Sequence, residues 1–208
     1  MVSNRRNRSR RPARAEARLD PKPRILVFCE GQNTEPQYIV AFRKWCRNPR
    51  VDVEIAKERG VPVTLVTSAK ERKRRAESEA RKARDANISY DEVWCVFDVD
   101  EHPKLKEAQN LAHAHGIRLA VSNPCFELWL LLHFRESPGM QHRHDLPKML
   151  AGFVPDYDKH VNFELFKEGY PAAVKRAQRL DEQASDDGEE GRNPTTGVYR
   201  LTQSIQRE

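Results

Sequence analysis

Apolar residues along the chain form two kinds of pattern. Three short continuous runs, in residues 24–29, 93–100 and 117–121, are rich in β-branched and aromatic side chains and are typical of strands buried on both faces. Between these runs, apolar residues recur every three or four positions, which predicts helices with one buried face. Because such strands and helices alternate, the pattern predicts an α/β fold with a mostly parallel sheet and flanking helices.

The predicted helices follow the strands closely. The first begins at Thr34, because Thr34 and Gln37 have the spacing of a capping box and Pro36 suits a first helical turn. The helix after Pro124 is apolar almost all round, so we expect it to be deeply buried. The other predicted helices comprise residues 68–86, 103–116, 145–153, 163–167 and 171–184, and a final helix from Thr195 or Thr196.

Two short segments predict strands near an edge of the sheet. Residues 51–55 alternate apolar with acidic side chains, and residues 61–66 are again rich in valine, with Gly60 and Pro62 at the turn between them. We expect a hairpin or two neighbouring strands there. Residues 181–191 contain six acids and no base, and we expect a mobile loop.

The length of 208 residues allows one core with appendages. We expect a basic tail at residues 1–24, an α/β core at 25–135 and a helical C-terminal extension at 136–208 that packs on the core. No apolar run approaches membrane-spanning length, so we expect no membrane partner. The N-terminus lacks the apolar region of a secretory signal, so we expect the four scattered cysteines to lie in a reducing cytoplasm.

Positive charge is concentrated at the N-terminus. Residues 1–24 carry nine Lys or Arg and two acids, whereas the remaining residues carry 28 basic and 29 acidic side chains. With few large apolar residues, this segment is expected to be disordered in isolation and to form a nucleic-acid-binding arm. A solubilising tail is the alternative. The arginines assigned to phosphate contacts are Arg5, Arg6, Arg8, Arg10 and Arg11.

A second run of basic residues falls on the helix predicted at 68–86. Residues 70–84 carry eight basic and three acidic side chains. This run is a candidate nucleic-acid-facing surface, and a solvated, salt-bridged helix is the alternative. The candidate contacts are Arg72, Lys73, Arg74 and Arg75.

Two aspartates end the central strand. Asp98 and Asp100 are two residues apart, so an extended chain points both carboxylates to the same side. Carboxylates this close repel each other unless a cation lies between them, and a hard cation such as Mg²⁺ prefers oxygen ligands. The sequence therefore predicts a metal site, with a pair of solvated acids at a turn as the alternative.

Two glutamates are expected at the same edge of the sheet. Glu30 follows the first strand and precedes a helix, which is the usual place for sites in parallel sheets. Glu127 is the only acid of the apolar helix after Pro124, so it should meet a cation or metal, or point out of the core. His133 is expected to make a structural hydrogen bond rather than a metal bond.

Four motifs carry a resemblance to a known family. CEGQNTE after the first strand, FDVDEH after the central strand, SNPCFELWLLLHF and NPTTGVYRL are similar to the RloB-like family, whose core resembles a Toprim domain. The resemblance covers most of residues 25–205. It implies a prokaryotic protein linked to restriction, anti-phage or abortive-infection systems, in some cases beside an AAA or ABC-type ATPase.

The resemblance also implies roles for single residues. In Toprim domains a strand ending in Glu-Gly supplies a general acid or base, and a later Asp-x-Asp holds Mg²⁺ or Mn²⁺; these would be Glu30, Asp98 and Asp100. Toprim-type nucleases usually have an aspartate four residues after the glutamate, where this chain has Thr34, with the acid at Glu35 instead. Thr34 and Glu35 are therefore candidate accessory residues. Such nucleases also often place a lysine near the phosphate, and Lys159 is the candidate here.

These observations predict a Mg²⁺-dependent nuclease that acts on DNA or RNA. One alternative is a phosphoryl-transfer enzyme of haloacid-dehalogenase type, because Asp98-Val99-Asp100 imitates its nucleophile motif. That family expects a threonine where this chain has His102. The other alternative is a non-catalytic Toprim-like module that binds nucleic acid.

Overall fold

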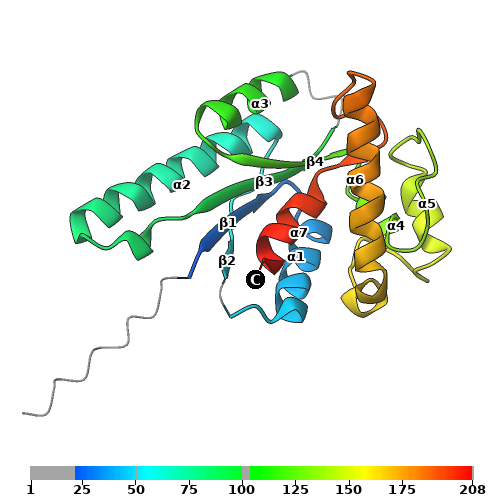
Figure 1. Ribbon diagram of the computed structural model, residues 1–208, viewed down its shortest axis with the longest axis horizontal. Helices are drawn as coiled ribbons and strands as arrows, with labels where there is room; N and C mark the ends of the chain where they lie inside the picture. The colour runs from blue at the N-terminus through cyan, green and yellow to red at the C-terminus, as the bar shows by residue number, and fades with distance from the viewer. Residues whose placement is uncertain (1–21, 50, 100–103, 208) are drawn as a thin grey trace, which may run out of the picture.

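The computed structural model describes residues 22–49, 51–99 and 104–207 (Figure 1). Its centre is a five-stranded sheet in the order β2-β1-β3-β4-β5, in which the first four strands are parallel and β5 is antiparallel to β4. Helices cover both faces, so the expected α/β class with a mostly parallel sheet is confirmed. The strands are β1 (Arg24–Cys29), β2 (Asp52–Ile55), β3 (Glu92–Asp98), β4 (Arg118–Asn123) and β5 (Thr195–Thr196).

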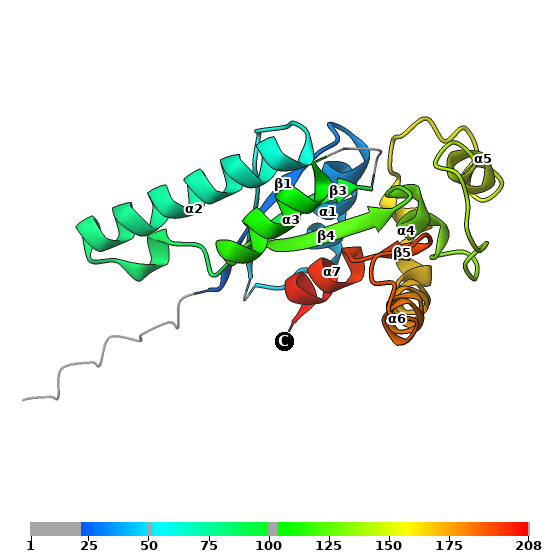
Figure 2. The same cartoon turned by 90° about the horizontal axis from the view of Figure 1, so that it is seen from above.

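The helices form two layers around the sheet. The elements α2 and α3 lie on one face, and α1, α6 and α7 lie on the other, while α4 and α5 lie beyond the end at which the arrow of β4 points (Figures 1 and 2). The helices are α1 (Thr34–Cys46), α2 (Pro62–Ala83), α3 (Leu105–Ala114), α4 (Glu127–Leu131), α5 (Leu146–Ala151), α6 (Tyr170–Asp186) and α7 (Val198–Gln206), with short 3-10 helices at Ala86–Ile88, Phe163–Leu165 and Lys167–Gly169.

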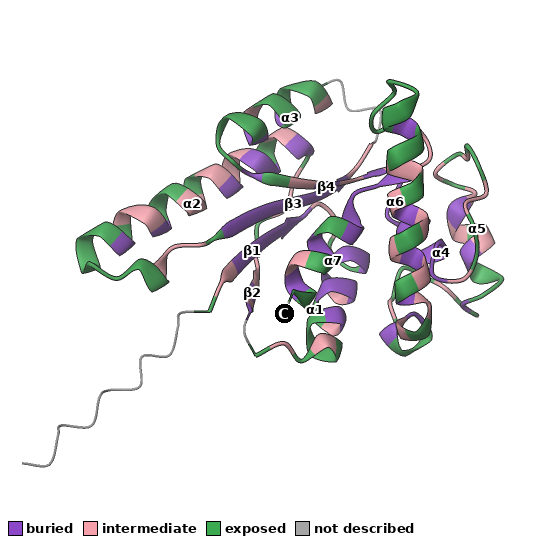
Figure 3. Cartoon of the chain, viewed as in Figure 1, coloured by how far each residue is buried: buried purple, intermediate pink, exposed green. Residues whose placement is uncertain are grey.

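Burial on both faces explains the continuous apolar runs of β1 and β3. In β1, Val27 and Cys29 belong to the apolar cluster under α1, whereas Leu26 and Phe28 belong to the cluster under α2 and α3. Alternate residues of β3 divide in the same way. A strand with no solvent-facing side has no polar alternation, and Figure 3 shows both strands buried along most of their length.

The segment 61–66 is helical, so the prediction of a second strand there is wrong. Helix α2 begins at Pro62, which supplies the first turn and cannot donate a ladder hydrogen bond. Leu65 and Val66 are buried on the same face as Ala69, at helical spacing. The expected helix start at Ser68 is therefore six residues late, and β2 pairs in parallel with β1 instead of forming a hairpin.

The last third is more regular than the sequence predicts. Helix α6 extends to Asp186, so the expected mobile loop at 181–191 begins as helix. Asp181 explains part of this, because its carboxylate accepts hydrogen bonds from Tyr199 and Arg200 of α7, each at 2.7 Å. Thr195 and Thr196 form β5 rather than the start of the last helix, and the Thr196 hydroxyl bonds that of Ser122 at 2.9 Å.

One apolar cluster joins the predicted core to the predicted extension. Trp129 of α4 lies in the same buried cluster as Tyr170 of α6 and Leu201 of α7. Residues 1–21 of the predicted tail, with Arg5, Arg6, Arg8, Arg10 and Arg11, lie outside the described residues. In the part of the chain that the structure describes, no helix combines the length and apolar character needed to cross a bilayer.

Candidate active site

A pocket of about 360 Å³ lies at the carboxyl edge of the sheet. The parallel register sets Cys29 beside Val96, so β1 and β3 end near each other and deliver Glu30 and Asp98 to one place. The start of α4 adds Glu127 to the same pocket. The lining residues are Glu30, Gly31, Gln32, Asn33, Thr34, Glu35, Asp98, Phe126, Glu127, Arg143 and Lys159.

Glu30 is fixed by its main chain and touches the next strand. Its backbone N–H donates to the carbonyl of Val96 at 2.9 Å, which extends the ladder between β1 and β3 by one residue. Its carboxylate Oε2 accepts a hydrogen bond from the backbone N–H of Asp98 at 3.3 Å. The two predicted metal-binding acids are therefore neighbours.

Glu35 is a buried acid in the first turn of α1. Its Oε1 accepts a hydrogen bond from the backbone N–H of Gly31 at 3.2 Å. A Cβ at Gly31 would overlap this carboxylate, so the glycine allows the close approach. Burial raises the pKa of Glu35, and the nearby charges of Glu127 and Glu30 raise it further, while its hydrogen bonds to backbone N–H groups lower it.

The pKa of Asp98 is raised by burial and by the neighbouring acids. Burial is the largest cause that raises its pKa well above the usual value, and the carboxylates of Glu35, Glu127 and Glu30 add to the effect. The guanidinium of Arg143 acts in the opposite direction and lowers the pKa. The pocket therefore holds more negative charge than its own cations compensate.

Glu127 is the first residue of the buried helix α4 and lines the pocket. Only 7 % of its surface is exposed. Its Oε1 accepts a hydrogen bond from the hydroxyl of Tyr157 at 3.2 Å. This bond satisfies part of a carboxylate that would otherwise be costly to bury.

Among the described residues, two cations line the same pocket, and the sequence predicts only one of them. Arg143 lies in the turn before α5, between His142 and His144. Its segment has no periodicity that would place it at the edge of the sheet, so the sequence contains no clear signal for it. The other cation, Lys159, was predicted; its backbone is left-handed, with φ of 72°.

The loop that carries Lys159 is tied to α1 by the two residues of the expected capping box. The Thr34 hydroxyl donates to the carbonyl of Lys159 at 3.0 Å, and the Gln37 side chain accepts from the N–H of Val161 at 2.9 Å. No side chain caps α1 at Asn33. The capping-box prediction is therefore wrong, because a loop distant in sequence takes both side chains.

The donor set at this edge fits a hard divalent cation. Asp100 lies outside the described residues, and within 22–49, 51–99 and 104–207 no three His, Cys, Asp or Glu side chains are arranged to hold a metal ion by themselves. Mg²⁺ in phosphate-handling sites is commonly held by only one or two carboxylates, with water and substrate phosphate as the other ligands. Glu30 and Asp98 match that requirement.

The basic residues predicted on α2 lie away from this pocket and partly in ion pairs. Arg72 pairs with Glu54 at 2.6 Å and with Glu58 at 3.6 Å. Lys73 donates to the backbone carbonyls of residues 115 and 116, and Arg75 pairs with Glu79 on the same helix. Arg74 is exposed on the surface of α2.

His133 has the structural role that the sequence predicts. Its Nε2 bonds the hydroxyl of Tyr38 at 3.0 Å, and its Nδ1 bonds the carbonyl of Trp129 at 2.9 Å. Both ring nitrogens are therefore occupied inside the apolar cluster. Burial lowers the pKa of His133 to about 4, which keeps the ring neutral.

Comparison with known proteins agrees with the motifs. The family model described as RloB-like protein matches residues 25–205, which is most of the chain. Searches of curated proteins and of solved structures each gave no match.

Proposed function

We propose that this chain, which belongs to the RloB-like protein family, is a Mg²⁺- or Mn²⁺-dependent nuclease with a Toprim-like core that hydrolyses phosphodiester bonds in DNA or RNA. The observation that carries the proposal is the convergence of four carboxylates, Glu30, Glu35, Asp98 and Glu127, in one pocket at the carboxyl edge of the sheet. Burial and the neighbouring carboxylates raise the pKa of Asp98, and such perturbed acids in a pocket are typical of functional sites.

Glu30 and Asp98 would hold the metal, with Glu127 close by. The Glu30 carboxylate accepts a hydrogen bond from the backbone N–H of Asp98, and both residues line the pocket from adjacent strands. A metal bound there supplies Lewis-acid stabilisation of the charge that develops on a phosphate. Asp100 is a further ligand in this proposal, on the strength of the Asp-x-Asp motif.

The other pocket residues would bind the phosphate and move the proton. Arg143 and Lys159 line the same pocket as the four acids. Their positive charges would stabilise the negative charge that develops on the phosphate in a phosphorane-like transition state. Glu30 is the proposed general base or acid, the role that the Toprim resemblance implies, and it directly precedes a turn in which Gln32 and Asn33 are exposed. Glu35 supports that loop through Gly31.

The proposed biological role and partner protein rest on the family resemblance alone. A restriction-linked or anti-phage role, and an ATPase as partner, are parts of the proposal that rest on the RloB-like resemblance. Co-purification of the tagged chain with its genomic neighbour would test the partner.

The proposal is tested by incubating the purified full chain with DNA and RNA in the presence of Mg²⁺ or Mn²⁺. We expect cleavage by the wild-type chain, and at least a hundredfold loss in Glu30→Gln and Asp98→Asn. Glu136→Gln is the matched control, since Glu136 is an exposed acid that pairs with Arg176 and Arg179 outside the pocket. Release of inorganic phosphate from phosphomonoesters without strand cleavage would favour a dehalogenase-type enzyme, and metal-independent binding without cleavage would favour a binding module.

A further inference from the structure

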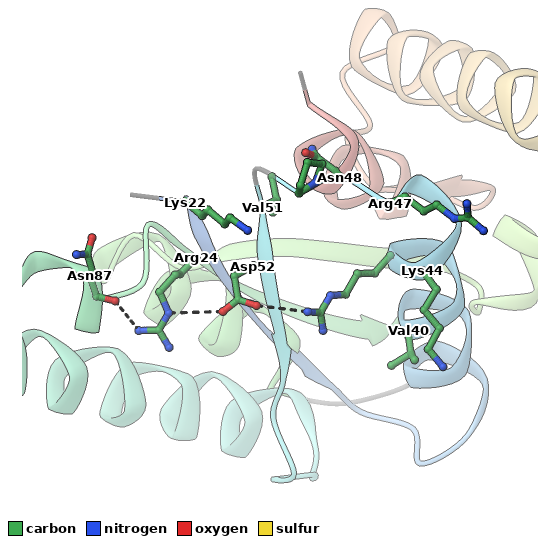
Figure 4. A pocket seen from close by; sticks show the side chains of 11 residues that line it. Lys22, Arg24, Val40, Lys44, Arg47, Asn48, Val51, Asp52 and Asn87 are labelled. Atoms are coloured by element: carbon green, nitrogen blue, oxygen red, sulfur yellow. Dashed lines mark hydrogen bonds and ion pairs between the residues drawn. The ribbon is translucent and has the colours of Figure 1, made fainter. Parts of the chain in front are cut away.

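A second cavity, about 740 Å³ in volume, lies at the opposite, amino edge of the sheet. It is bounded by the start of β1, the start of β2 and the last turns of α1 (Figure 4). Its volume is within the range of about 300–1,000 Å³ that is usual for ligand sites. It shares no lining residue with the acidic pocket.

The charge of this cavity is opposite to that of the acidic pocket. Asp52 is the one acid among the described residues that line it. Asp52 forms ion pairs with two arginines, at 3.8 Å from Arg24 and 3.4 Å from Arg43, so its charge is already compensated. Figure 4 shows the pair of Asp52 with Arg24. The basic lining residues are Lys22, Arg24, Arg43, Lys44 and Arg47.

Three of these cations have side chains without a partner among the described residues. Among the described residues, the side chains of Lys22, Lys44 and Arg47 have no hydrogen bond or ion pair, whereas Arg24 also donates to the carbonyls of Asn87 and Ile88. The C-terminal dipole of α1 explains some positive charge at Lys44, worth about 0.3–1 kcal/mol. It does not explain Lys22, which comes from the other wall of the cavity.

The cavity is also held in shape. The amide of Asn48, in the loop after α1, donates to the carbonyls of Ile205 at 3.2 Å and Arg207 at 2.6 Å, which ties this loop to the end of α7. Arg47 is left-handed, with φ of 47°, and its N–H closes α1 on the carbonyl of Arg43. The cations of α1 are therefore presented from a fixed backbone.

We infer that this basic cavity binds phosphate groups of a nucleic-acid backbone. A concave surface with one sign of charge concentrates anions, and arginine and lysine are the usual phosphate-binding side chains. A small anion would need only the cavity, but the sequence before Lys22 adds further positive charge, since residues 1–21 carry seven arginines and two acids. A polyanion fits that distribution.

The choice of nucleic acid as ligand rests on the proposed function, while binding at this cavity is separate from the chemistry. Helix α1 runs from the acidic pocket to the basic cavity, and its 13 residues span about 20 Å at 1.5 Å per residue. That distance is roughly six steps of a duplex at about 3.4 Å per step. One bound nucleic acid can therefore reach both sites.

The test measures binding of the full chain to a labelled 20-base-pair DNA duplex and a 20-nucleotide RNA, in EDTA so that no metal-dependent cleavage occurs, at several salt concentrations. The test variant is Lys44→Gln with Arg47→Asn, because asparagine tolerates the left-handed backbone. Lys22→Gln is a second, independent variant, at a residue that precedes β1 on the other wall of the cavity. The charge-matched control is Lys106→Gln with Lys175→Gln, two exposed lysines on α3 and α6.

We expect the double variant to bind at least one of the two nucleic acids about tenfold more weakly at moderate salt, and the slope of log K against log salt to fall by about 2. Lys22→Gln should lower the slope by about 1, and the control should stay within twofold of wild type. Equal affinity and slope in the test and control variants would overturn the inference. So would selective loss of binding to phosphatidylserine vesicles with nucleic-acid binding unchanged. Cleavage in Mg²⁺ is scored separately, so a chain that binds in this manner but never cleaves refutes only the proposed nuclease.

Discussion

The carboxylate of Glu30 accepts a hydrogen bond from the backbone N–H of Asp98 at 3.3 Å, which joins the ends of two adjacent parallel strands. This contact brings together acids that are 68 residues apart in the chain. It depends only on the parallel register of β1 and β3, because that register sets Cys29 beside Val96. The strand ends therefore bring these two acids together by themselves, whereas Arg143 and Lys159 reach the pocket from loops.

Asp98→Asn should stabilise the metal-free protein at neutral pH. The folded protein raises the pKa of Asp98 above its ordinary value of 3.8, so the native state binds this proton more tightly than the unfolded state. Stability is then lost as pH rises above about 4, and the variant avoids this loss. We expect the melting temperature in EDTA at pH 7.5 to rise by about 2–6 °C.

The control for this prediction is Asp186→Asn, which removes an exposed aspartate of α6. Its melting temperature should match wild type across the pH range, while the advantage of Asp98→Asn should shrink as pH approaches 4. A lower melting temperature for Asp98→Asn at pH 7.5 would show that the aspartate is favourably paired and not repelled.

Acid should destabilise the protein through His133. Burial lowers its folded pKa to about 4 from an ordinary value of 6.5, so the unfolded state binds this proton more tightly. The stabilising contribution is complete above about pH 6.5 and is lost as pH falls toward 4, by up to about 3 kcal/mol. In His133→Gln this part of the pH dependence should disappear, as measured by chemical denaturation at pH 4.5 and 7.5.

The exposed His113 provides the comparison. His113→Gln should keep the wild-type difference between the two pH values. If His133→Gln keeps it as well, the buried ring is not the group responsible, and the acid sensitivity must come from carboxylates that are paired in the native state.

Thr34→Val should lower the kcat/KM of cleavage strongly and the free energy of unfolding only slightly. The Thr34 hydroxyl positions Lys159 through the Lys159 carbonyl, and loss of this bond should cost about 1 kcal/mol of stability. Because the lysine would lose its fixed position at the pocket, we expect kcat/KM to fall about tenfold, with the larger part in kcat. Thr67→Val is the matched control, since the Thr67 hydroxyl bonds only Val63 of its own helix. If Thr34→Val cleaves at the wild-type rate, the fixed position of Lys159 does not contribute to cleavage.

The sequence predicts most of the sheet and the acids, because both follow from local patterns. An apolar run such as that of β1 is diagnostic of a strand buried on both faces, and an acid directly after it must lie at the edge of the sheet. The strand prediction for residues 61–66 is wrong because a valine-rich run of six residues fits a strand and a helix equally well. The tertiary packing of Leu65 and Val66 selects the helix. Arg143 reaches the pocket through a loop that has no pattern, so only the folded chain reveals it.

Whether Glu30 and Asp98 share a divalent metal can be seen by anomalous diffraction from crystals of the full chain soaked in Mn²⁺. We expect one strong anomalous peak in the acidic pocket, about 2.1 Å from carboxylate oxygens of both Glu30 and Asp98, and no such peak in crystals of Asp98→Asn. A soaked wild-type crystal with no manganese in this pocket, or with manganese bound only at other acids, would contradict this expectation.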